Sequence, residues 1–118
     1  VESSKYDVAN QLRAAYELAG MKVDFTGSYP GWKPKPGSEI VKIMENLYEV
    51  NFGDKPHVVA CHAGLECGII GANYPKMDMV SFGPTIRGAH SPEERANIPS
   101  TQKFWKFLKD ILSNIPKK

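Results

Sequence analysis

The pattern of apolar positions predicts an amphipathic helix at the start of the chain. Ser3 or Ser4 can cap this helix and Gly20 ends it. Between these residues the apolar side chains recur at helical spacing and form one face: Val8, Leu12, Ala15, Tyr16 and Ala19. Residues 22–29 then alternate between apolar and polar, which predicts a strand. Because an unpaired strand edge tends to recruit another chain, we expect residues 4–29 to form a homodimer contact.

The rest of the chain alternates helices with short apolar runs. Helices are expected at three places: from a cap at Ser38 to Gly53, over about 65–73, and over about 101–114. The last has a clear apolar stripe, consisting of Phe104, Leu108, Ile111, Leu112 and Ile115. Two runs that are too short for helices, 57–61 and 77–82, predict buried strands. This order of elements indicates an α/β fold in which helices pack on a sheet.

Two strands do not make a stable sheet, so the remaining strands are expected from sequence outside this chain or from another chain. The chain begins with Val1 rather than Met, and VESS has the pattern of a strand end that enters a helix. We therefore expect the chain to be a piece of a longer polypeptide. A stretch rich in proline and glycine, PGWKPKPG at 30–37, cannot form a helix or strand and is interpreted as an inter-domain connection.

Composition restricts the partners more than the fold. The chain has 42% hydrophobic and 24% charged residues, which are globular values. Lys+Arg 15 against Asp+Glu 13 is too balanced to indicate a nucleic-acid or membrane partner. No secretory signal or membrane span precedes or interrupts the helices, so a cytoplasmic location is expected unless a missing start carries a signal. Cys61 and Cys67 are expected to be reduced thiols rather than part of a disulfide scaffold.

Most of the candidate chemistry lies in two loops that follow the short apolar runs. HAGLE at 62–66 carries His62 and Gly64, and GPTIRGAHSPEE at 83–94 carries His90. Glycines surround both histidines, as is expected where backbone approaches a ligand or a metal closely. Each histidine also has a plainer interpretation, the first in a strand-to-helix turn and the second as a polar surface residue.

Three further features have plain alternatives as well. SPEE is a capping box with Ser91 as the N-cap and Glu94 three residues later, which predicts a helix start within this loop. Glu66 can be a metal ligand or a base, but the helix dipole favours an acidic residue in a first turn anyway. Arg87 can bind a carboxylate through two hydrogen bonds, yet a loop arginine is more often solvated.

The chain supplies no complete catalytic motif of its own. A zinc site needs at least three protein ligands, and a two-metal site needs about five. The three histidines of the chain, His57, His62 and His90, show no ligand spacing. Sequences of the types HExxH, paired CxxC, GxSxG and GxxxxGK[ST] are absent.

Four motifs together point to a known family. YPGW, HAGLECG, SFGP and AHSPEE, in this order and at this spacing, closely resemble the aminoacyl-histidine dipeptidases (Xaa-His dipeptidases, or peptidase D). These are bacterial members of the co-catalytic zinc exopeptidases. The similarity covers essentially the whole chain and corresponds to the C-terminal portion of such enzymes. It implies a metallodipeptidase that hydrolyses unblocked Xaa-His-type dipeptides and uses two zinc ions or other divalent metals.

The resemblance also implies a domain organisation, in which a smaller α+β lid domain interrupts an α/β catalytic domain. Residues 1–32 then correspond to the end of the lid or dimerisation domain, and 33–118 to the last part of the catalytic domain. His90 carries over as a zinc ligand, and Gly64 as part of the substrate pocket, with His62 a weaker candidate. The bridging aspartate and the general-base glutamate belong to the missing half, so no catalytic residue and no independent activity are expected here. The alternative is a non-catalytic α/β interaction module that retains the peptidase scaffold.

Overall fold

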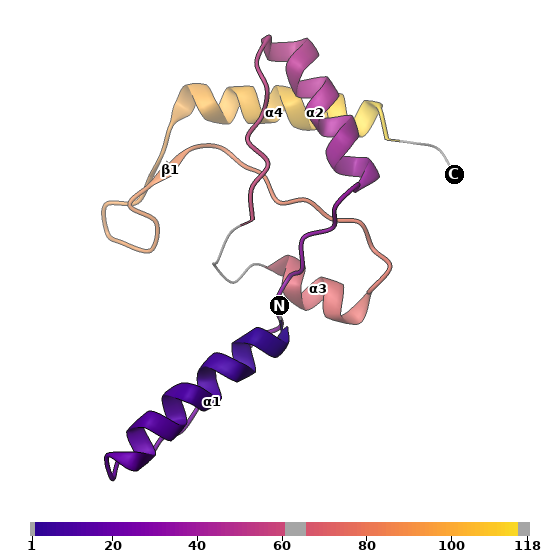
Figure 1. Cartoon of the computed structure of the whole chain (residues 1–118). Coiled ribbons are helices and arrows are strands. Elements are labelled where there is room, and N and C mark those ends of the chain that lie inside the picture. The colour runs from indigo at the N-terminus through magenta and orange to yellow at the C-terminus, as the bar shows by residue number, and fades with distance from the viewer. Residues whose placement is uncertain (1, 61–65, 116–118) are drawn as a thin grey trace. The chain divides into compact units, whose positions relative to one another are not determined.

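The computed structural model describes residues 2–60 and 66–115, and its chain divides into two compact units. Unit 1 comprises Val1–Lys35 and Ala60–Met77, and unit 2 comprises Pro36–Val59 and Asp78–Lys118. Within the described residues the elements follow in the order α1, α2, α3, β1, β2 and α4 (Figure 1). This mixture of helices and a small sheet confirms the α/β class of a partial domain. No helix in this part of the chain is long and apolar enough to cross a membrane.

In unit 1, helix α1, Glu2–Leu18, ends where the sequence predicts. Gly20 has a positive φ of 80° and donates its N–H to the carbonyl of Glu17, at 2.9 Å. The N–H of Met21 reaches the carbonyl of Tyr16, at 3.0 Å, which completes a Schellman motif. No residue of α1 is buried, so the predicted apolar face lies open in this unit.

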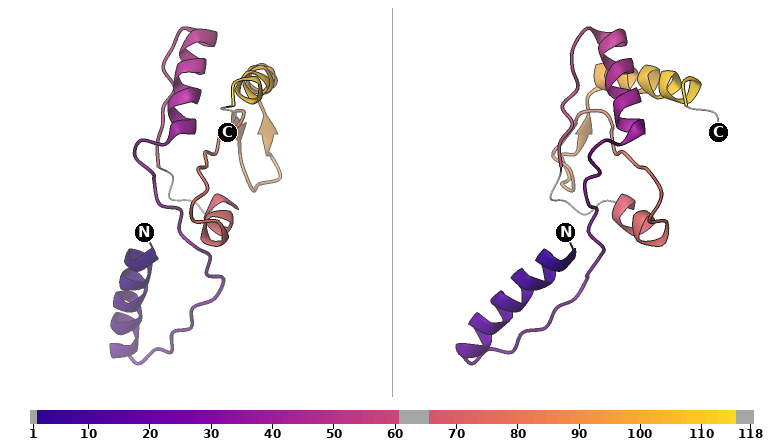
Figure 2. Two further views of the ribbon diagram at one scale, coloured as in Figure 1. Left: turned by 90° about the vertical axis from the view of Figure 1, so that its right-hand side faces the viewer. Right: turned by 45° about the vertical axis from the view of Figure 1, so that its right-hand side comes forward.

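The chain that follows α1 runs back beside the helix (Figure 2). The Lys5 Nζ donates to the carbonyl of Tyr29, at 2.8 Å, and the N–H of Gly31 donates to Glu2 Oε2, also at 2.8 Å. Lys5 and Glu2 form an ion pair at 2.6 Å. The Lys5 ammonium, and after it the Gly31 N–H, lower the pKa of the Glu2 carboxyl below its usual value.

Helix α3, Glu66–Asn73, lies close to the start of the proline-rich connection and confirms the helix expected at about 65–73. Gly68 is buried, and a methyl group placed on it would lie 2.5 Å from the carbonyl oxygen of Pro30. Only glycine permits a helix and a neighbouring backbone to approach this closely without a shift.

In unit 2, helix α2, Glu39–Phe52, begins and ends as predicted. Ser38 is buried and caps the helix, while its Oγ donates to Asp78 Oδ2, at 2.9 Å. The same carboxylate oxygen accepts the N–H of Glu39, at 3.1 Å. A serine and an aspartate distant in sequence thus satisfy the first donors of the helix. Gly53, with a φ of 69°, ends it.

Helix α4, Ile98–Ser113, begins earlier than the predicted start near residue 101. Asn97 is its N-cap, and the Asn97 Oδ1 accepts the N–H of Ser100, at 2.9 Å. Pro99 lies in the first turn, where a proline leaves no hydrogen bond unmade. The sequence NIPS is therefore the true start signal of this helix.

The core of unit 2 lies where α4 packs on α2. Within the described residues its buried apolar side chains are Met44, Phe107 and Ile111. Partly buried side chains surround them: Ile40, Leu47, Tyr48, Phe52 and Val80. Phe107 meets three rings edge-on, with centroid distances of 5.4 Å to Tyr48, 5.9 Å to Phe52 and 5.7 Å to Phe82. Each such ring pair stabilises the fold by about 0.5–1.5 kcal/mol beyond the contribution of the apolar area that it buries.

The predicted strands at 22–29, 57–61 and 77–82 are wrong for the part of the chain that the structure describes. Their described residues are extended and join no sheet, and the sheet that does form pairs β1, Ile86–Arg87, with β2, Arg95–Ala96. A strand is stable only when a neighbouring strand accepts and donates its backbone hydrogen bonds. The described residues provide no neighbouring strand for these segments, although their sequence pattern is that of strands.

The cap of α2 gives a direct test of this packing. Replacing Ser38 with Ala removes both the helix cap and the hydrogen bond to Asp78, so we expect a loss of about 0.5–2 kcal/mol in the free energy of unfolding. Urea denaturation followed by circular dichroism measures it. Ser81→Ala is the matched control, because Ser81 is exposed in the same unit and should change stability by no more than a few tenths of a kcal/mol. Equal stability of the two variants would contradict the assigned cap.

Candidate functional site

His90 lies in the loop of a β-hairpin in unit 2. The strands are antiparallel, with Ile86 opposite Ala96 and Arg87 opposite Arg95. His90 is exposed and has a φ of 63°, and it is the one non-glycine residue with a positive φ in the described ranges. Such a conformation costs roughly 1–2 kcal/mol for an L-residue, so the surrounding loop has to hold it.

Hydrogen bonds within the loop do so. Glu94 Oε2 accepts the N–H of His90, at 2.8 Å. The carbonyl oxygen of Gly88 accepts two hydrogen bonds from Ser91, one from the Oγ hydroxyl at 2.7 Å and one from the backbone N–H at 3.1 Å. The N–H of Glu94 in turn donates to the carbonyl of Ser91, at 3.1 Å. The backbone is therefore fixed by two consecutive turns while the imidazole stays open to solvent.

These contacts correct the prediction that SPEE starts a helix. The chain turns at Ser91, and no helix begins between Ser91 and Ile98. Glu94 does reach back to a backbone N–H, as in a capping box, but to that of the residue before the expected cap. The physical reason is that Arg95 and Ala96, which a helix would need in its first turns, are paired with β1.

The loop fits one ligand of a metal site and no more. An imidazole nitrogen is a good zinc ligand, and the ring of His90 is exposed on a loop whose backbone is held by hydrogen bonds. In residues 2–60 and 66–115 no three His, Cys, Asp or Glu side chains come together. A metal site that included His90 would need its other ligands from outside these residues.

The other candidates are less informative. His62 and Gly64, predicted to line the substrate pocket, lie outside the described residues, as does Cys61. Glu66 is exposed in the first turn of α3, the position that the helix dipole favours. Cys67 is a free, partly buried thiol, as expected.

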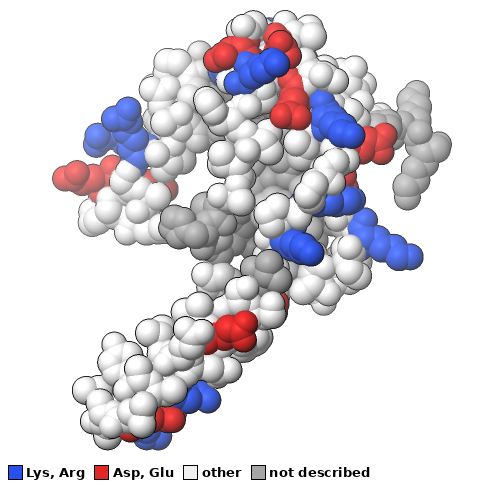
Figure 3. All heavy atoms as spheres, in the orientation of Figure 1, with Lys and Arg blue, Asp and Glu red and all other residues white. Residues whose placement is uncertain are grey.

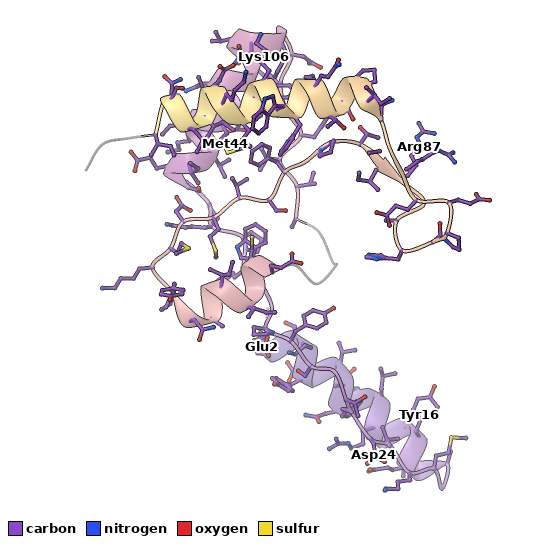
Figure 4. All side chains as sticks on the ribbon, turned by 180° about the vertical axis from the view of Figure 1, so that it is seen from behind. Glu2, Tyr16, Asp24, Met44, Arg87 and Lys106 are labelled. Atoms are coloured by element: carbon purple, nitrogen blue, oxygen red, sulfur yellow. The ribbon has the colours of Figure 1, made fainter. Side chains whose placement is uncertain are left out.

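The hairpin register brings forward a residue that the sequence interpretation missed. Arg95 lies directly opposite Arg87, so both side chains project from the same face of the ladder. Figure 3 shows basic atoms at this hairpin with acidic atoms beside them, and in Figure 4 the Arg87 side chain points away from the ribbon. Because the hairpin itself was not predicted, its register and this pairing could not be read from the sequence.

Gly88 permits a test of how the loop holds His90. It has a φ of 64°, and a methyl group on it would lie 3.1 Å from Ser91 Oγ and 3.2 Å from the carbonyl of Glu93. Gly88→Ala should therefore cost roughly 1–2 kcal/mol and shift the amide resonances of the loop. Gly83→Ala is the control, since nothing lies within 4 Å of its added methyl group. Unchanged loop resonances in Gly88→Ala would show that the loop is not fixed as described.

Comparison with known proteins agrees with the motifs. No family model matches the chain. The chain is 42% identical over all of its 118 residues to the cytosol non-specific dipeptidase of Escherichia coli (strain K12). It spans 24% of the length of that protein, within its C-terminal part. The resemblance to a dipeptidase that the motifs predicted is therefore confirmed, and the chain is related to such an enzyme along its whole length.

Proposed function

We propose that this chain is the C-terminal portion of a zinc metallodipeptidase that hydrolyses unblocked dipeptides, especially those of the Xaa-His type. The observation that supports this most is a fixed, exposed His90 in a chain 42% identical to a dipeptidase. The chain spans 24% of the length of that relative. We propose that the activity is that of a complete polypeptide and that this portion alone is inactive. Residues 1–32 belong to a lid or dimerisation domain, and 33–118 to the catalytic domain.

His90 serves as one ligand in a site for two zinc ions or another pair of divalent metals. When bound, such metals polarise the scissile carbonyl and lower the pKa of a bound water. The hairpin loop fixes the backbone of His90 and therefore the direction in which its side chain leaves the chain. Gly64 and His62 form part of the substrate wall. The general base, and the remaining ligands, come from the rest of the polypeptide.

We further propose that the enzyme acts in the cytoplasm on a small peptide substrate, with neither a nucleic acid nor a membrane as partner. The relative is named as a cytosolic protein, and the near balance of charge, +2 at pH 7, provides no strong field for a polyanion.

Replacing His90 tests the assignment of the metal ligand. In the complete enzyme, His90→Ala should lose about one zinc per subunit. It should also lose well over about 100-fold in kcat/KM, since even groups that only orient a ligand cost 10–100-fold. Elemental analysis and hydrolysis of an Xaa-His dipeptide measure the two effects. His57→Ala, an exposed histidine elsewhere in unit 2, should keep both zinc and activity. Full metal content and normal turnover in His90→Ala would end the assignment.

Homodimer formation through residues 4–29 is the remaining part of the proposal. Helix α1 has no buried residue, and its apolar side chains are about half exposed: Tyr6 53%, Val8 55%, Leu12 51% and Tyr16 50%. A helix face of this kind needs a partner surface. The extended segment beside it can add backbone hydrogen bonds to the same contact.

Light scattering tests the dimer. The 118-residue chain should have the mass of a dimer at high concentration, whereas Leu12→Glu should shift it to the monomer, because a buried carboxylate is costly. Gln11→Glu adds the same charge at a neighbouring position outside the apolar face and should remain dimeric. A chain that is monomeric at every concentration would refute the proposal.

A further inference from the structure

We propose that Glu94 is a positioning residue for His90, and that its carboxylate holds the backbone of His90 in the conformation from which the imidazole binds a metal ion. The observation that carries this inference is the hydrogen bond of 2.8 Å from the N–H of His90 to Glu94 Oε2. The inference rests on the proposed function and deepens it, because it gives a role in metal binding to a side chain that acts through the backbone and not as a ligand.

The turn that contains His90 is one in which a histidine is unfavourable. The N–H of Ser91 donates to the carbonyl of Gly88, at 3.1 Å, so residues 88–91 form a β-turn with His90 in its third position. The φ of His90 is 63°, and a positive φ at the third position is required in a type II turn, where glycine or asparagine is usual. A glycine would adopt this conformation without strain. A histidine destabilises the turn, so the surrounding residues have to hold it in place.

Glu94 is anchored by the strand that follows it. Its backbone N–H donates to the carbonyl of Ser91, at 3.1 Å. The next residue, Arg95, is the first residue of β2 and pairs with Arg87 of β1. The carboxylate therefore reaches back across the loop from the start of a paired strand to the N–H of His90. A hydrogen bond to an ionised acceptor is about twice as strong as one between neutral groups, which suits it to holding a strained residue.

Loss of this hydrogen bond would weaken metal binding through the population of the competent loop. Without it, His90 can relax to a negative φ, and its side chain then leaves the backbone in a different direction. Metal binding would require the positive φ to be restored, so the apparent affinity falls in proportion to the fraction of molecules that already have it. Partners that support a metal ligand in this way typically contribute about 10- to 100-fold to metal affinity.

Two conservative substitutions separate positioning from the other ways in which a carboxylate can assist metal binding. Glu94→Gln removes the charge but keeps an oxygen at the same reach, so it can still accept the N–H of His90. Glu94→Asp keeps the charge, but its side chain is one methylene shorter and falls short of that N–H. A carboxylate that acted as a ligand or through its charge would be impaired by the glutamine, whereas positioning is impaired by the aspartate.

The test measures the zinc affinity of the complete enzyme by competition with a chelator. Glu94→Asp should bind zinc at the site of His90 about 10- to 100-fold more weakly than the unaltered enzyme. Glu94→Gln should stay within about 3-fold of it, because a neutral acceptor retains about half of the strength of the hydrogen bond. Glu93→Gln is the matched control and should bind zinc normally, since Glu93 is exposed and its carboxylate accepts no hydrogen bond from a described residue. The reverse order of the two Glu94 variants, or equal affinity in both, would overturn the inference.

Hydrogen exchange in the metal-free complete protein gives a second measurement, which separates this inference from the proposed function. The amide of His90 should exchange at least about 10-fold faster in Glu94→Asp than in the unaltered protein, and should remain protected in Glu94→Gln. An unprotected His90 amide in the unaltered protein would overturn the inference. Full zinc content in His90→Ala would refute the proposed ligand instead, whereas a site that needs His90 and is indifferent to Glu94→Asp would refute the positioning role alone.

Discussion

The packing of Phe107 against α2 is the interaction on which the candidate site depends. It fixes α4 on the core of unit 2, and the start of α4 then fixes the hairpin. The N–H of Asn97 donates to the carbonyl of Thr85, at 3.0 Å, and the N–H of Thr85 donates to Ser100 Oγ, at 2.9 Å. The base of the hairpin is therefore tied to the first turn of a helix. An exposed two-residue ladder is marginal by itself, and these bonds give the loop with His90 a rigid support.

Elements that depend on contacts between residues close in sequence could be predicted, whereas elements that depend on distant partners could not. The caps at Ser38 and Gly53 and the Schellman glycine at Gly20 depend on hydrogen bonds within a few residues, and all three are confirmed. Strands depend on partners that are distant in sequence, and here the pattern failed. The same limit explains SPEE, since only the pairing of β2 with β1 decides that the residues after it are extended rather than helical. Glu94 does accept a backbone N–H, as a capping box predicts, but the hydrogen bond lies in a turn and not at the start of a helix.

The positive φ of His90 connects this local structure with the proposed role. A histidine in the left-handed region is unfavourable, and Glu94 offsets that cost by accepting its N–H. A conformation of this kind sets the direction in which the side chain leaves the backbone. Strain at an exposed residue contributes nothing to the core, so its presence supports a functional reason for this backbone conformation.

Helix α4 carries apolar side chains on two sides. One side of it, with Phe107 and Ile111, is buried on α2. Ile98, Trp105 and Leu112 follow at intervals of seven residues and form a second apolar stripe, with exposed fractions of 72%, 58% and 61%. Apolar residues on two sides are typical of a helix that is enclosed on both. The chain spans 24% of the length of its relative, and under the proposed function the rest of a complete polypeptide would cover this stripe and pair with the extended segments.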